Sequence, residues 1–76
     1  MLWRLPLEAT GSVVVFDVMG RRIATLAEGQ LSAGEHTIEW TGAAQNGASA
    51  GAGLYFVRLA AGGTVRTARF VRIGGF

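Results

Sequence analysis

The sequence of 76 residues is long enough for one domain, contains no cysteine and carries a formal net charge of +2. These values exclude disulfides and thiolate metal sites, and no apolar run is long enough for a membrane-spanning helix. Half of the residues are hydrophobic and only 16% are charged. This composition indicates a module that packs against a neighbouring domain, or a surface that a partner covers.

Two apolar runs near the start of the chain predict β-strands. In residues 2–5, Trp3 and Leu5 share one face, and Pro6 ends this strand or keeps it at an edge because proline cannot donate to a ladder. The valine-rich run 12–18 predicts a second strand, since β-branched residues favour the extended conformation. The residues between the two strands are expected to form a connection.

A hairpin is predicted after the second strand. Gly20 supplies the positive φ that such turns require, and Asp17 is placed to accept hydrogen bonds from the backbone amides of the turn. The return strand is expected over 22–28, stopped by the glycine that follows. Under strict alternation Ile23 and Leu26 point to opposite faces, so either a bulge intervenes or both faces are partly covered.

The clearest alternation of polar and apolar residues lies in 35–40, between a turn at Gly34 and a stop at Gly42. This pattern predicts a half-buried strand with Trp40 as a main anchor of the core. His36 falls on the same apolar face and has no further metal ligand beside it, which favours a packed structural histidine over a metal site.

The second half of the chain predicts a long hairpin. Residues 43–52 are predicted to form a glycine-rich loop. Both faces of the strand over 53–60 start with apolar residues, so we expect it to be central and covered on both sides for much of its length. A tight turn at 61–63 leads to a last strand over 64–73. Both faces of this strand mix polar and apolar residues, so the pattern does not tell which face is buried. Six short strands without a convincing helix predict a small antiparallel sandwich.

No residue pattern indicates catalysis, a cofactor or a metal, so the domain is expected to be non-enzymatic. All seven basic residues are arginines, and three of them lie in the last strand. Solvated arginines that protect a sheet edge explain this bias, and an anionic partner such as nucleic acid or lipopolysaccharide is the alternative. Because the core needs nearly all of the few aromatic rings, we expect no nucleic-acid partner.

Three stretches together resemble the C-terminal sorting domains of type IX secretion cargo. They are the hairpin 15–26, the strand 33–42, and the run 53–59 with Gly62-Gly63 and Arg69-Phe70-Val71-Arg72. The same pattern is similar to the immunoglobulin-like domain of the flagellar hook-capping protein. The match covers the chain from about Leu5 to Ile73 and is specific as a combination.

The resemblance implies an all-β, antiparallel immunoglobulin-like sandwich of six to seven strands over residues 1–76, lacking its first strand. Sorting further implies an upstream cargo domain, a signal peptide outside this chain, and passage through the periplasm to the cell surface or the medium. The expected partner is then the secretion machinery at the outer membrane. A structural or assembly module of the hook-capping or cell-surface kind is the alternative.

The matched motifs also assign expected roles to individual residues. Recognition falls on Gly53, Tyr55, Arg69, Phe70, Val71 and Arg72. Roles in turns and structure fall on Asp17, Gly20, Gly34, Trp40 and Gly42.

Overall fold

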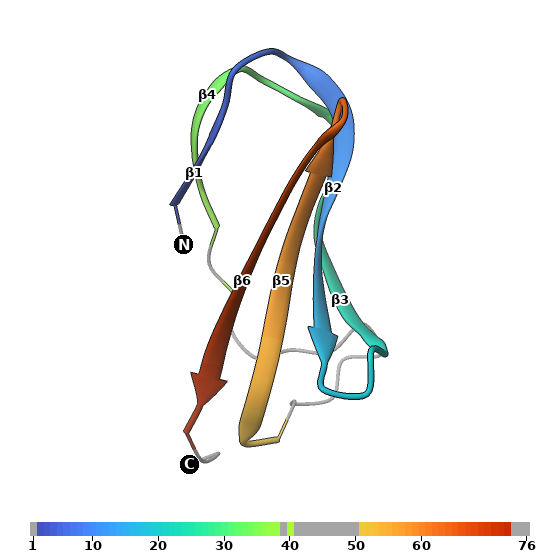
Figure 1. Cartoon of the computed structure of the whole chain (residues 1–76), viewed down its shortest axis with the longest axis vertical. Coiled ribbons are helices and arrows are strands. Elements are labelled where there is room, and N and C mark those ends of the chain that lie inside the picture. The colour runs from blue at the N-terminus through green and yellow to red at the C-terminus, as the bar shows by residue number, and fades with distance from the viewer. Residues whose placement is uncertain (1, 39, 41–50, 74–76) are drawn as a thin grey trace.

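A computed structural model describes residues 2–38, 40 and 51–73, and within these ranges every regular element is a β-strand (Figure 1). The strands are β1 (Leu2–Leu5), β2 (Ala9–Asp17), β3 (Arg22–Leu31), β4 (Gly34–Thr37), β5 (Gly53–Ala61) and β6 (Thr64–Arg72). All strand pairs are antiparallel, which confirms the predicted fold class. Most of the loop expected over 43–52, and Gly42, lie outside the described residues.

The strands form two sheets with the connectivity of an immunoglobulin domain. One sheet has the order β3-β2-β5-β6, and the other pairs β1 with β4. In immunoglobulin folds a C′-C-F-G sheet packs over a sheet that pairs strands B and E. The strands β2, β3, β5 and β6 take the places of C, C′, F and G, while β1 and β4 take those of B and E.

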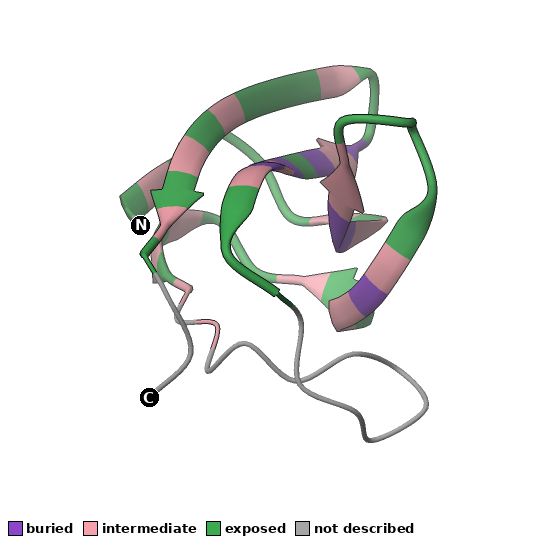
Figure 2. Cartoon of the chain, turned by 90° about the horizontal axis from the view of Figure 1, so that it is seen from below, coloured by how far each residue is buried: buried purple, intermediate pink, exposed green. Residues whose placement is uncertain are grey.

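The core lies between the two sheets and consists of hydrocarbon. Val13 and Val15 of β2 and Val57 and Leu59 of β5 are its largest fully buried side chains. Leu5 of β1 belongs to the same cluster and is only 2% exposed, so the small sheet closes over the large one. In Figure 2 buried and more exposed positions follow one another along the strands, because successive side chains point to opposite faces.

Bulges in β3 explain why its apolar residues do not alternate. The pairing of β2 with β3 shifts register between Val13 and Val14 and again between Val15 and Phe16. Leu26 and Ile23 are skipped at these shifts, and both pack against the core. Because a bulge inserts one extra residue into a strand, residues that strict alternation would place on opposite faces can both point to the core. Of the two alternatives left by the sequence, the structure therefore contains the bulge.

The hairpin of β2 and β3 is longer than the sequence predicted. β2 begins at Ala9, and β3 continues through Gly29 to Leu31, so the expected stop at Gly29 is wrong. Gly29 lies directly opposite Gly11, and its positive φ of 111° is accommodated within the ladder. Beyond this pair the Thr10 hydroxyl donates to Gln30 Oε1 at 3.0 Å, which holds the extended ends together.

The end of β4 and the cover of β5 also differ from what the local sequence pattern predicts. The strand predicted over 35–40 ends at Thr37 in β4, so Trp40 lies beyond it. β5 is central, between β2 and β6, as predicted. One of its faces belongs to the core. On the other face Leu54 and Phe56 are half-buried and Arg58 is exposed, so the expected cover of both faces for much of the length is only partial on this side.

Candidate functional site

The turn between β2 and β3 is organised by Asp17, as the sequence predicted. Its Oδ1 accepts hydrogen bonds at 2.9 Å from the backbone amides of Met19 and Arg21, and the Gly20 amide donates to the Asp17 carbonyl oxygen at 3.0 Å. Gly20 has a φ of +80°, which a glycine adopts without strain. The Arg21 guanidinium completes the site with an Nε to Oδ2 distance of 2.8 Å.

These bonds lower the pKa of Asp17. Desolvation of the carboxylate raises its pKa, but hydrogen bonds from the Arg21 amide and guanidinium, the charge of Arg21 and the Met19 amide together outweigh it. The carboxylate is thus held ionised inside a turn. Both carboxylate oxygens of Asp17 already accept hydrogen bonds within the turn, so this arrangement is structural.

Three aromatic rings form a cluster at one end of the core. Trp40 meets Tyr55 edge-to-face with ring centroids 5.0 Å apart and meets Phe70 at 5.5 Å, while Tyr55 and Phe70 stack at 5.9 Å. The Tyr55 hydroxyl donates to the Gly51 carbonyl oxygen at 2.7 Å. A tyrosine near the start of strand F that bonds back to upstream backbone is the tyrosine corner of immunoglobulin-like domains. Trp40 is half-buried and packs against the core through the rings of Tyr55 and Phe70, while the largest fully buried side chains belong to β2 and β5.

The residues predicted for recognition do not share one surface. Tyr55 and Phe70 lie in the aromatic cluster, and Arg72 lies over the Trp40 ring with its guanidinium carbon 5.9 Å from the centroid. Gly53 opens β5 opposite Arg72, with a φ of +148°. Arg69 and Val71 alternate with these residues and point to the opposite face, where both are exposed. Their role in recognition stays a prediction.

His36 has a structural setting. It is half-buried opposite Trp3, and its Nε2 forms a hydrogen bond with the Ser32 carbonyl oxygen. Gly34 begins β4 with a φ of +107°. Across the part of the chain that the structure describes, no three His, Cys, Asp or Glu side chains gather as metal ligands. No described helix is long and apolar enough to cross a membrane.

The face of the four-stranded sheet that points away from β1 and β4 carries an unusual combination of side chains, and we refer to it as the outer face. Residues directly opposite in an antiparallel pair share a face, so the register defines its members. Its apolar members are Val14, Phe16, Leu54, Phe56, Ala60, Val65 and Val71, and its basic members are Arg22, Arg58 and Arg69.

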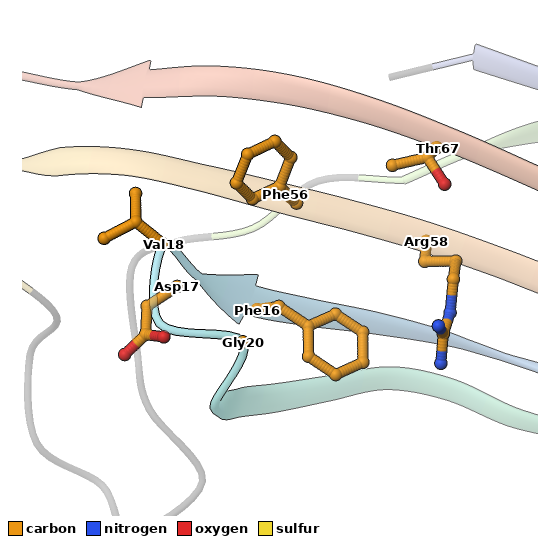
Figure 3. Close-up of a pocket in the computed structure, with 7 residues that line it drawn as sticks. All are labelled: Phe16, Asp17, Val18, Gly20, Phe56, Arg58 and Thr67. Carbon is orange, nitrogen blue, oxygen red and sulfur yellow. The ribbon is translucent and has the colours of Figure 1, made fainter.

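One row of the outer face crosses all four strands as Arg22, Phe16, Phe56 and Arg69. The Arg58 guanidinium carbon lies 4.8 Å from the Phe16 ring centroid in a cation–π contact. A shallow hollow between these strands is lined by Phe16, Asp17, Val18, Gly20, Phe56, Arg58 and Thr67 (Figure 3). Figure 3 shows the Phe16 and Phe56 rings coming from the neighbouring strands β2 and β5.

The sequence pattern did not identify the outer face as a surface. Alternation alone places Phe16 with Val14, and Phe56 with Leu54 and Arg58, but it does not say which strands are neighbours. Both faces of the last strand mix polar and apolar residues, so only its register with β5 assigns Arg69 and Val71 to the outer face.

The four-stranded sheet, the smaller sheet that covers it and the tyrosine corner define a small immunoglobulin-like β-sandwich. Residues 4–65 match the family model of the FlgD Ig-like domain, and the chain belongs to this family. Searches of curated proteins and of solved structures find no match. The family match supports the hook-capping side of the expected resemblance, and no comparison supports the type IX sorting domain.

Proposed function

We propose that this domain is a non-catalytic structural module that helps to assemble a larger protein structure, as the hook-capping alternative implies. The observation that carries the proposal is the match of residues 4–65 to the FlgD Ig-like domain. The settings of the polar side chains agree with it. Asp17 holds a turn and His36 bonds to the Ser32 backbone, so neither is presented to a substrate.

Type IX sorting is the competing hypothesis, and two observations weigh against it. The matched family is that of the hook-capping domain. Tyr55 and Phe70, which sorting would use for recognition, pack in the aromatic cluster of the core, where burial and ring contacts already account for them. Recognition would then depend on the exposed Gly53, Arg69 and Val71 and on the half-buried Arg72.

The assembly proposal is tested in the organism that makes the chain. A tagged copy is cross-linked in cells, and its sedimentation is compared with that of the purified chain of 8.0 kDa. We expect the tagged chain to sediment with a large assembly and to form specific cross-links to its neighbours. Recovery only as an uncross-linked monomer would contradict the proposal. A reporter fused to residues 1–76 that leaves the periplasm of a type IX-competent bacterium would favour sorting instead.

A further inference from the structure

We propose that the outer face of the four-stranded sheet binds an acidic, partly apolar polypeptide segment of an assembly partner. The inference rests on the proposed assembly function and specifies the surface and the chemistry of the partner. Three features of the outer face carry it: its exposed hydrocarbon, its excess of arginine, and the way in which Arg58 covers Phe16.

The hydrocarbon of the outer face is more than a free antiparallel sheet normally shows to water. Such sheets present alternating polar residues on their solvated face. Here Phe16 and Phe56 lie side by side across β2 and β5, and Val71 on the adjoining strand is 69% exposed. At the rim of the hollow, Val18 is 61% exposed. Exposed apolar side chains gathered on one face are typical of a contact site, and a protein partner is one such contact.

The positive charge of the outer face indicates a negatively charged partner. Arg22, Arg58 and Arg69 all belong to it and are all exposed. Among the described residues, three acids lie on it or near it. Asp17 is held by Arg21 at 2.8 Å, and the Glu8 carboxylate accepts a hydrogen bond from Gln30 Nε2 at 2.8 Å. Glu28 is exposed and lies opposite Ser12, in the middle of the β2–β3 pair. A partner that places carboxylates against these arginines gains electrostatic complementarity, whereas a second copy of the same face would meet like charge.

The contact between Arg58 and Phe16 favours a polypeptide over nucleic acid. Binding of single strands requires open aromatic faces on which bases stack. The guanidinium of Arg58 lies over the Phe16 ring and occupies that face, while Phe56 is half-buried. A stacked guanidinium still presents its N–H edge, which matches the two oxygens of a carboxylate. Apolar side chains of the same segment would fill the hollow beside Val18 and Thr67.

The experiment titrates the isotope-labelled full chain with a short synthetic peptide that alternates glutamate and leucine, and follows backbone NMR shifts. We expect shifts concentrated at Phe16, Phe56 and Arg58, and binding that weakens with added salt. Each of R58S and R69S should weaken binding about two- to fivefold, the effect of an exposed ion pair. The matched control R66S removes an exposed arginine from the opposite side of β6 and should leave binding unchanged.

Several results would overturn the inference. They are equal binding of a peptide with lysine in place of glutamate, shifts that lie away from the outer face, preferential binding of a single-stranded oligonucleotide, and self-association through this face. If the peptide fails while the tagged chain still sediments with an assembly, only the assignment of the outer face is wrong. If the peptide binds as expected but the tagged chain is monomeric in cells, the assembly function fails instead.

Discussion

Tyr55 combines burial of its ring with a hydrogen bond from its hydroxyl, and the two contributions can be separated. The Y55F variant keeps the contacts with Trp40 and Phe70 but loses the bond to the Gly51 carbonyl oxygen. We expect a loss of about 1 kcal/mol in the free energy of unfolding, the usual net value of one hydrogen bond. Denaturant titration measures it. An unchanged midpoint would show that this bond does not tie the start of β5 to the preceding segment.

Asp17 should make the stability of the domain depend on acid pH. Because its pKa in the folded state lies below the unfolded value of about 3.9, its contribution is complete above that value. The contribution is lost as the pH falls through the lower folded-state pKa. In D17N the amide oxygen can still accept the bonds from Met19 and Arg21, but the charge is absent.

The comparison of the two proteins isolates the titration of this one carboxylate. We expect the wild-type chain to lose more stability than D17N between neutral and strongly acid pH, as measured by thermal unfolding at a series of pH values. Parallel curves for the two proteins would show that the pKa of Asp17 is the same in the folded and unfolded chain, which would contradict the prediction.

At the scale of the elements, the close approach of β2 and β5 at Gly11 is a packing constraint. A Cβ added at Gly11 would lie 2.1 Å from the Ala60 carbonyl oxygen and 2.5 Å from the Ala61 Cβ. G11A should therefore cost about 1–3 kcal/mol through overpacking. The control is G51A, where an added Cβ meets no atom within 4 Å and the change should stay within about 0.5 kcal/mol. Equal stability of the two variants would contradict the packing argument.

The elements also show which parts of this fold can be predicted from sequence. The Asp17 turn and the central place of β5 follow from local chemistry and alternation, and the structure contains both. For β3, alternation left a bulge as one of two alternatives, and the register shows the bulge. The continuation of β3 through Gly29 depends on the partner that lies opposite, which no local pattern contains. The same is true of the outer face, because four strands contribute to it and only their register makes Arg22 and Arg69 members of one row.

At the scale of the whole molecule, the question is whether the two sheets are separate units or one. β1 and β4 pair only with each other among the described strands, yet Leu5 of β1 is buried in the same cluster as Val15 and Leu59. A chain of this size buries roughly 60% of its unfolded surface and has little stability to divide between two cores. Among the described residues of the small sheet, Leu5 belongs to this cluster and Trp3 packs against it, so the small sheet is expected to depend on the large one for its stability.

The two tryptophans test this dependence, because Trp3 belongs to the small sheet and Trp40 packs on Tyr55 of the large one. The variants W3F and W40F each leave a single fluorescent reporter. For each variant, the midpoint from its tryptophan fluorescence should coincide with the midpoint from far-ultraviolet circular dichroism, as two-state unfolding requires. An earlier transition seen only by Trp3 in the W40F variant would mean that β1 and β4 detach from a four-stranded sheet that stays folded without them.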